Sequence, residues 1–441
     1  MCIRDSFTAV AVLTLALGIG ATIAIFSVLD GVVLKPLSYA QPEQLVGLEV
    51  TPLAIDASLR GMAAEDYFVF RDHSRTLEDI GVYAETDTDR DVNVTGFAEP
   101  ERVHALDITH GVLSVLAVPP MLGRTFSPAD DSPGAPLTAI LTYGYWYRRF
   151  SADPSTVGKT IIVNGMARQI IGVLPRNFQF LDMQDLALIL PLQLDRNKTL
   201  LGNFSYFGIA RLKVGSTLSQ ASVDVARMLP ITLDTFPPPP GVSTDSMHKA
   251  GFAPSLLPLK QEVIGNVGLL LWLLMGSIGM VLLIACANVA NLLLVRTEGR
   301  QNELALRAAL GASRRRIGAQ LLCESAVIGL LGSVCGLGLA WAALRVLVAL
   351  APSGLPRISD IGVNLPVLYF SLGVTVFTGL LFGLVPVLKH TGVRAGAPEG
   401  GDVYKRQEYR LEARATRGVL PRQKSKKNPP SAGRRLPSVR F

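Results

Sequence analysis

The chain has 441 residues, of which 49% are hydrophobic and 17% are charged. Soluble domains carry about 25% charged residues, so apolar segments must be concentrated in part of this chain. The formal net charge of +7 comes from the end of the chain, since residues 401–441 hold 12 Lys and Arg against 3 Asp and Glu, whereas residues 1–400 hold 30 basic and 32 acidic groups. The charge therefore does not indicate a nucleic-acid-binding surface.

Four apolar runs are long enough for helices that cross a membrane, which need about 20 residues. They span residues 7–29, 265–295, 325–344 and 361–388. A cleaved signal peptide is the alternative for the first run, but its length and the lack of an Ala-x-Ala-like cleavage site favour a retained span. Each run is expected to be helical, since irregular backbone does not face lipid.

The arginines between the second and third runs predict the orientation of the chain. Lys and Arg collect in short cytoplasmic loops of membrane proteins. This connection carries six arginines, against Glu298 and Glu303: Arg296, Arg300, Arg307, Arg314, Arg315 and Arg316. We therefore expect this loop and both chain ends inside the cell, and residues 35–260 outside.

The polar segment between the first two runs is predicted to be a mixed α/β domain. Helical spacing covers 64–77, 143–150 and 218–228, and strands are expected at 44–50, 137–141 and 204–213. The Asn164-Gly165 pair predicts a hairpin of strands 160–163 and 168–173. The four consecutive prolines in 236–241 indicate a loop. The domain holds no cysteine between residues 40 and 260, so it cannot contain a disulfide there.

The two ends of the chain share no pattern with the rest. Residues 1–6 (MCIRDS) and 402–441, including DVYKRQ, resemble read-through scars at the ends of assembled fragments. Neither end is expected to form part of the fold. The alternative is a native disordered basic tail attracted to anionic lipids.

From residue 7 onward the sequence resembles ABC transporter permeases of the MacB/FtsX type, within these the large acidobacterial-type permeases that carry the unit twice. The matching segments are FTAVAVLTLALGIGATIAIFSV (7–28), VVLKPLSYAQPEQLV (32–46), LTYGYWYRRFSADPSTVGKTIIVNG (141–165), IGVLPRNFQF (171–180) and LLIACANVANLLLVRTEGRQNELALRAALGASRRRI (282–317). The resemblance covers about residues 7–390, and the last segment is its most specific part.

This resemblance implies an α-helical membrane protein with four transmembrane helices and a mixed α/β extracytoplasmic domain, the MacB-type periplasmic core. The expected division is transmembrane helix 1 at 7–33, the core domain at 34–262, an FtsX-like permease domain at 265–390 and a basic tail at 391–441. Within the permease domain we expect spans at 265–295, 318–345 and 361–388 and a cytoplasmic coupling segment at 296–316. The family's basic stretch before the first span and its second half are not found here, so the chain resembles a truncated first half.

The coupling segment is the main functional prediction. Residues 303–310 fit a short amphipathic helix, in which Glu303 and Arg307 are spaced for an i,i+4 ion pair and Gly311 suits the C-cap. Such a helix can seat in a groove of a cytosolic partner. The resemblance implies that Glu303, Arg307, Gly311, Arg314, Arg315 and Arg316 contact an ATPase. From the residues alone, an ordinary positive-inside loop is the more common interpretation.

Polar and small residues in the spans suggest contacts between helices. Asn288 and Asn291 lie one turn apart, and buried amides in lipid seek partners on other helices. The pairs Gly332 with Gly336 and Gly379 with Gly383 have the GxxxG spacing that lets helix backbones approach. At the start of the third run Glu324 could be an ion site, but its position beyond the arginines favours a salt bridge.

The sequence shows no arrangement of residues that is typical of a catalytic site. Gly158-Lys159-Thr160 imitates part of a P-loop, but Asp153 stands where the phosphate cradle needs glycine. Of the five histidines, only His104 and His110 lie close together, near Asp107, which is a weak metal signal.

The functional hypothesis is therefore a non-catalytic permease subunit without a cofactor, in a bacterial inner membrane with its large domain in the periplasm. Its expected partners are a cytosolic ABC ATPase subunit, a second permease unit (a homodimer or the missing second half) and the lipid bilayer, but no nucleic acid. It would couple ATPase closure to movement of the outer domain, for export or mechanotransmission. The alternative is a membrane-anchored sensor or adhesion module without an ATPase.

Overall fold

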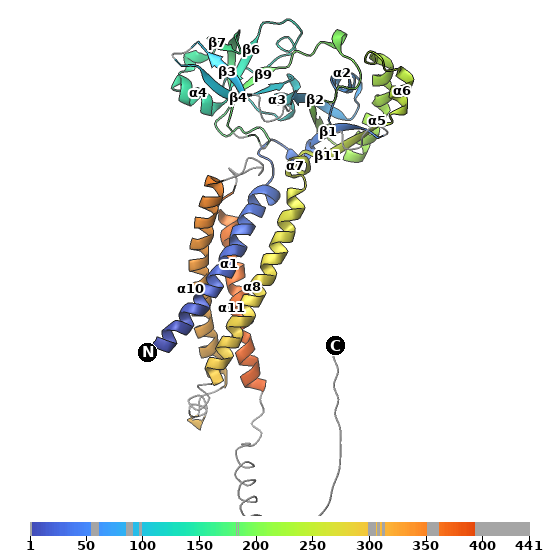
Figure 1. Cartoon of the computed structure of the whole chain (residues 1–441). Helices are drawn as coiled ribbons and strands as arrows, with labels where there is room; N and C mark the ends of the chain where they lie inside the picture. Colours follow the sequence, from blue (N-terminus) through green and yellow to red (C-terminus); the bar gives the residue numbers. More distant parts are fainter. Residues whose placement is uncertain are drawn as a thin grey trace, which may run out of the picture.

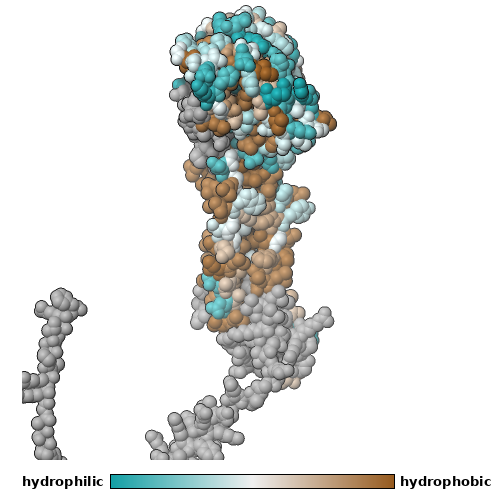
Figure 2. Space-filling model, turned by 90° about the vertical axis from the view of Figure 1, so that its right-hand side faces the viewer, coloured by the Kyte–Doolittle hydropathy of each residue, from teal (hydrophilic) through white to brown (hydrophobic). Residues whose placement is uncertain are grey.

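The computed structural model describes residues 2–53, 61–84, 91–96, 99–181, 183, 185–298, 306, 309–310, 314–350 and 361–392. These residues form a long helical bundle that carries an α/β domain, the outer domain, at one end (Figure 1). The surface follows this division. The bundle is mostly hydrophobic and the outer domain is mostly hydrophilic (Figure 2).

Among the described residues, four helices form the bundle. They are α1 (Cys2–Leu29), which continues as the π-helix η1 (Asp30–Leu34), α8 (Val267–Glu298), α10 (Arg314–Ala349) and α11 (Leu365–Gly392). Three apolar stretches are long enough to cross a membrane, namely Thr8–Leu34, Val267–Arg296 and Cys323–Ala349. In α11 the apolar stretch is shorter, Leu365–Leu381. The structure thus supports three of the four expected spans by length and composition.

Helix α1 lies between α8 and α10 (Figure 1). Its inward face repeats every fourth residue, as an α-helix requires, and is fully buried at Ala11, Leu15, Ile19 and Ile23. These side chains share one apolar cluster with α8 and α10, whose members there include Leu282, Cys286, Val289, Leu293, Ile328 and Ala340. Packing around α1 therefore holds the described bundle together.

The strands of the outer domain join one mixed sheet, in the order β11-β1-β10-β2-β4-β3-β7-β8-β6-β9, with β5 paired to β8. Their bounds are β1 Leu45–Pro52, β2 Leu77–Ala84, β3 Asp91–Thr95, β4 Glu101–Ile108, β5 Leu122–Gly123, β6 Thr138–Leu141, β7 Thr160–Val163, β8 Met166–Val173, β9 Leu186–Pro191, β10 Phe207–Leu212 and β11 Phe252–Pro258. An additional parallel pairing of β4 with β9 closes one half of the sheet on itself.

The helices of the outer domain cover this sheet. They are α2 Ala64–His73, α3 Gly111–Val115, α4 Tyr143–Phe150, α5 Leu218–Thr235, α6 Thr244–Lys249 and α7 Leu259–Ile264. One core lies under α2 and α5, a second around α4 inside the closed half, and a third between them that includes Leu37 and Leu259.

The first and last strands of the domain are neighbours. β1 pairs with β11 in antiparallel register from Val46 opposite Pro258 to Pro52 opposite Phe252. The chain enters β1 from the membrane and returns to it after β11. The pairing therefore brings the two connections to the bundle side by side, and Figure 1 shows both at the base of the domain.

Most elements predicted in the outer domain are confirmed, with shifted ends. The predicted helix 64–77 ends at His73, because the carboxylate of Asp224 on α5 accepts hydrogen bonds from the amides of Arg75 and Thr76 and holds that segment extended. The predicted helix 218–228 continues to Thr235 and contains Pro230.

Candidate functional site

The coupling segment is only partly described. Glu303, Arg307 and Gly311 lie outside the described residues. Arg314, Arg315 and Arg316 begin α10, so they form the first turn of a helix and not the end of a loop as predicted. The side chain of Arg316 is exposed. A helix N-terminus carries a partial positive charge, so three adjacent cations are electrostatically unfavourable there without an outside anion.

The inner ends of two helices are joined by an ion pair. The guanidinium of Arg296, in the last turn of α8, lies 3.0 Å from the Glu324 carboxylate on α10. Both side chains are partly buried, so the pair is worth more than a fully exposed one. The salt bridge predicted for Glu324 is confirmed, and it links α8 to α10.

The two asparagines do not pack as predicted. Asn288 and Asn291 are exposed on α8, because the inward face of this helix is taken by Cys286, Val289 and Leu293. Neither amide therefore faces another helix in the part of the chain that the structure describes. In hydrocarbon an exposed amide is costly, so these side chains favour a partner outside the described chain or a place near the interface.

The glycine pairs behave differently from each other. A Cβ atom on Gly332 would lie 2.8 Å from the Leu15 Cβ atom, and one on Gly336 would lie 3.0 Å from the Ala16 carbonyl oxygen and the Gly20 amide. The backbones of α1 and α10 thus touch at Gly20 and Gly336. By contrast, a Cβ on Gly379 would meet nothing within 4 Å, so the packing expected there is not found among the described residues. Gly383 lies in α11, beyond the residues whose surroundings are described.

Replacing Gly336 with leucine should separate α1 from α10 and lower the stability of the bundle by about 2 kcal/mol, since overpacking typically costs that much. Thermal unfolding of the full chain in nanodiscs measures the effect. Gly379→Leu is the matched control and should change little, because that side chain would enter open space. Equal midpoints for both variants would contradict the predicted contact.

The first connector, residues 35–44, leaves the bundle through the π-helix η1. Its hydrogen bond from the Lys35 amide to the Asp30 carbonyl spans five residues, and such π-helical turns are often found at functional positions. The buried Asp30 carboxylate accepts a 2.7 Å hydrogen bond from the Asn364 side-chain amide, and the Asn364 side-chain oxygen accepts from the Val367 amide at the start of α11. The outer ends of α1 and α11 are therefore joined.

The second connector, residues 259–266, is held against η1, where the first connector begins. The Lys260 ammonium donates to the Leu34 carbonyl at 3.1 Å. On α7 the Glu262 carboxylate occupies the space that a side chain at Gly47 would fill, since a Cβ there would lie 1.1 Å from Glu262 Oε2. An apolar cluster of Val28, Leu29, Val32, Ile264, Leu271, Leu344 and Ile361 completes the contact between the connectors and the outer ends of the helices.

Two polar side chains fasten the first connector to the outer domain. The Tyr39 hydroxyl donates to the Gln179 carbonyl at 2.8 Å and accepts from the Leu181 amide at 2.9 Å. Arg211 on β10 is buried and donates to the Ala40 carbonyl at 3.0 Å and to the Val115 carbonyl at 2.7 Å. The connectors and these contacts, called the junction below, make a continuous path from the bundle to the domain.

Sequence reasoning missed the junction almost entirely. Tyr39 and Arg211 carry no local pattern, because their partners lie more than 90 residues away in the chain. Asp30 offered the one usable signal, as the single charge before Lys35 in an apolar run. An ionisable residue in such a run is a functional-site hypothesis by default.

A pair of buried acids lies far from the junction, in the first turn of α2. Burial raises the pKa of Glu65 to about 8 and that of Asp66 to about 7. The neighbouring Asp66 adds to the shift of Glu65, while hydrogen bonds from the Gly202 amide to Glu65 and from Thr232 to Asp66 act against burial. We therefore expect this pair to make the stability of the domain depend on pH.

No metal or nucleotide site is found among the described residues. No group of three His, Cys, Asp or Glu is placed to hold a metal ion there. His104 pairs with Asp91 and His110 with Asp131, so the two histidines do not converge. Lys159 pairs with Asp153, the residue that stands where a P-loop needs glycine.

Two family models match the chain. The model described as the MacB-like periplasmic core domain covers residues 8–228, half of the chain, and the model described as the FtsX-like permease C-terminal covers residues 275–392. No curated protein matches the chain.

Several solved structures resemble the outer domain at low identity. A domain of a permease protein from Porphyromonas gingivalis is 14% identical and covers 50% of this chain and 93% of its own, with a TM-score of 0.37. The extracellular domain of the ABC-type transporter YknZ from Gram-positive bacteria is 15% identical and covers 48% and 99%, with a TM-score of 0.33. The periplasmic region of MacB from Actinobacillus actinomycetemcomitans is 13% identical and covers 48% and 88%, with a TM-score of 0.33.

Proposed function

Because the chain belongs to the ABC transporter permeases of the MacB/FtsX type, we propose that it is a non-catalytic subunit that converts closure of a cytosolic ATPase into movement of the outer domain. In this proposal α11 is a fourth span, the protein lies in the bacterial inner membrane, and the outer domain is periplasmic. The movement serves export or mechanotransmission.

The junction is the observation that carries the proposal. A flexible linker would dissipate a displacement of the helices, whereas this chain joins the bundle to the domain by two short connectors. Lys260 binds the second connector to η1, Asp30 and Asn364 bind η1 to α11, and Tyr39 and Arg211 bind the first connector to the outer domain. Rigid helices connected in this way can carry movement from one side of a membrane to the other.

The inner end of the bundle is where the ATPase would act. Arg314, Arg315 and Arg316 stand at the start of α10, where the helix dipole disfavours cations. An acidic groove on a cytosolic partner would relieve that cost and would also accept the amphipathic segment 303–310. The Arg296–Glu324 pair would pass the resulting displacement to α8.

A second permease unit would cover the outward face of α8. Asn288 and Asn291 leave two amides on this face, and such groups in lipid are stabilised by hydrogen bonds to another helix at about 0.6 to 2 kcal/mol each. Two units side by side would let one ATPase closure move both outer domains.

Charge reversal at the inner end tests the proposal. The variant with Arg307, Arg314, Arg315 and Arg316 changed to Glu should bind the cytosolic ATPase at least about tenfold more weakly, because several charge-assisted contacts are lost. Co-purification of the membrane-inserted full chain with the ATPase measures this.

The control reverses exposed cations of the outer domain, Lys198 and Lys249, and should leave the association unchanged. The proposal fails if the inner-end variant inserts normally and retains full association with the ATPase.

A further inference from the structure

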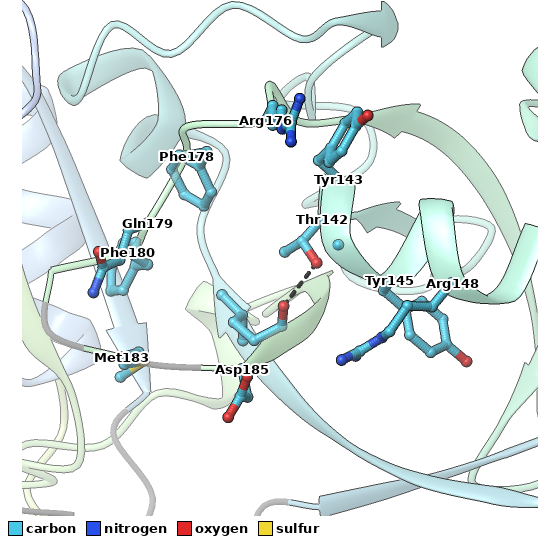
Figure 3. Close-up of a pocket in the computed structure, with 12 residues that line it drawn as sticks. Thr142, Tyr143, Tyr145, Arg148, Arg176, Phe178, Gln179, Phe180, Met183 and Asp185 are labelled. Atoms are coloured by element: carbon cyan, nitrogen blue, oxygen red, sulfur yellow. Dashed lines mark hydrogen bonds between the residues drawn. The ribbon is translucent and has the colours of Figure 1, made fainter. Parts of the chain in front are cut away.

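A cavity of about 340 Å³ lies in the outer domain, beside the junction contact between Tyr39 and Gln179. It is enclosed by the start of α4, by the segment that follows β8, and by the start of β9 (Figure 3). Small-molecule sites are typically concave and about 300 to 1,000 Å³, so this cavity has room for one small organic ligand.

Two arginines line the cavity from separate elements. Arg148 comes from α4 and Arg176 from the segment after β8, and Figure 3 shows them on different sides of the cavity. Neither pairs with a carboxylate among the described residues. The Arg176 guanidinium instead lies 5.7 Å from the centre of the Tyr143 ring. Two cations in a concave site attract an anion, and a planar guanidinium suits a carboxylate.

The remaining walls restrict the kind of anion. Phe178, Phe180 and Met183 form an apolar wall opposite α4. Among the described residues that line the cavity, Asp185 is the one carboxylate, and it disfavours a ligand with a second negative charge. The lining therefore favours a single acidic group joined to an apolar body over a phosphate or a dicarboxylate.

The backbone at the start of α4 adds to the attraction for an anion, but the two arginines are the main source of it. Thr142 precedes the helix, and its hydroxyl donates a hydrogen bond to the Leu186 carbonyl at 2.7 Å (Figure 3). The hydroxyl accepts no hydrogen bond from the amides of the first turn. Gly144 leaves this turn open, since a Cβ there would meet nothing within 4 Å. The free amides can approach a ligand oxygen beside the arginines.

We propose that this cavity binds an organic monocarboxylate with an apolar body, whose carboxylate is attracted by Arg148 and Arg176 and whose body packs on Phe178 and Met183. A short acyl chain and the C-terminal residue of an apolar peptide share this chemistry. The two sources differ in the amide group that a peptide presents to Gln179 and Asp185 on the rim.

The apolar wall is attached to the junction. Tyr39 holds the Gln179 carbonyl and the Leu181 amide, which flank Phe180 in the wall. A ligand that orders this wall would therefore also order the first connector. This consequence rests on the proposed coupling function, whereas the binding itself does not.

Calorimetric titration of the full chain in nanodiscs tests the binding. The probes are hexanoate for the acyl source, N-acetylphenylalanine for the peptide source, and the primary amide of each as a neutral control. We expect one or both acids to bind and the amides to bind at least about tenfold more weakly, since each amide lacks the charge that the arginines recognise.

Arg148→Met and Arg176→Met should each weaken binding of the acid by about tenfold. Arg75→Met, which removes an exposed arginine outside the cavity, should leave it unchanged. Both positions in the cavity are exposed, so these variants should fold. Equal affinity for acid and amide, or acid binding that survives both substitutions, would overturn the proposal while leaving the ATPase association test unaffected.

Tyr39→Phe separates binding from its consequence. It removes the hydroxyl that joins the wall to the first connector but leaves the cavity lining intact. The acid probe should slow hydrogen exchange of residues 37–44 in the wild type and have several-fold less effect in the variant, at equal affinity. Binding without any slowing in the wild type would overturn the link to the junction.

Discussion

Replacing Arg211 with methionine should lower the free energy of unfolding of the outer domain by about 3 kcal/mol and release the first connector from the sheet. Its partners among the described residues are oxygens of neutral groups, the Ala40 and Val115 carbonyls and the Gln44 side-chain amide. Methionine keeps the apolar volume but leaves buried carbonyls without donors, and each such loss costs about 1 to 3 kcal/mol. Removal of a buried charge offsets part of this cost.

Replacing Arg211 with lysine tests whether the planar shape of the guanidinium or its charge stabilises the domain. It keeps the cation on a flexible stem, but one ammonium group cannot replace the planar guanidinium that reaches both carbonyls. We expect Arg211→Lys to lose most of the stability that Arg211→Met loses. Arg102→Met, at a position whose side chain is 58% exposed, should cost less than about 0.5 kcal/mol.

The unfolding of the outer domain can be followed in the full chain. The sequence has three tryptophans, and changing Trp272 and Trp341 to phenylalanine leaves Trp146, which is buried in the outer domain. Denaturant unfolding of this background then reports on the domain, and hydrogen exchange of residues 37–44 reports on the connector. If the Arg211→Met variant has the same free energy of unfolding and the same hydrogen-exchange rates as the wild type, the role assigned to Arg211 is contradicted.

The sequence predicted those parts of the fold whose signals are local. The Asn164-Gly165 pair adopts positive φ at both residues and joins β7 to β8, and α4 has the bounds expected from its periodicity. Both depend on contacts between residues a few positions apart. The family resemblance supplied the MacB-type core domain and the FtsX-like permease region, and the family models confirm the family. The fourth span stays a prediction.

Long-range pairing explains much of what was missed. β2, β9 and β11 were not predicted, because each of them pairs with a strand far away in sequence, as with β2 beside β10 and β11 beside β1. β3, β4 and β5 were not predicted either, although β3 and β4 form a local antiparallel pair. The junction is harder still, since Arg211 joins segments separated by 171 residues. No periodicity in either segment reports such a contact. For the coupling segment, Glu303 and Arg307 stay predictions.

Stability of the outer domain should fall as the pH rises from about 4 to about 8. Glu65 and Asp66 have folded-state pKa values of about 8 and about 7, above their ordinary values of 4.5 and 3.8. In this window the unfolded chain has released both protons while the folded domain still holds them. The folded state therefore loses its advantage with increasing pH, by an amount on the order of a few kcal/mol for the pair.

Other carboxylates act in the opposite direction at lower pH. Hydrogen bonds from Arg227 and from the amides of Arg75 and Thr76 outweigh burial and hold the pKa of Asp224 at about 2, and Arg124 together with Ser127 lowers the pKa of Asp130. The stability that these groups contribute is lost as the pH falls below about 4. The domain should thus be most stable in acidic solution near pH 4, where the acidic and the alkaline loss of stability are both small.

The double variant Glu65→Gln, Asp66→Asn should flatten the alkaline side of this profile, because neutral amides have no proton to release. Asp224→Asn is the matched control and should change only the acidic side. Denaturant unfolding followed by Trp146 between pH 3 and 9 measures all three proteins. Because the Glu65 Oε2 atom has no hydrogen-bond partner among the described groups, its amide replacement adds no lost contact there. A wild-type profile that stays level from pH 4 to 8 would show that these acids are not protonated in the folded domain.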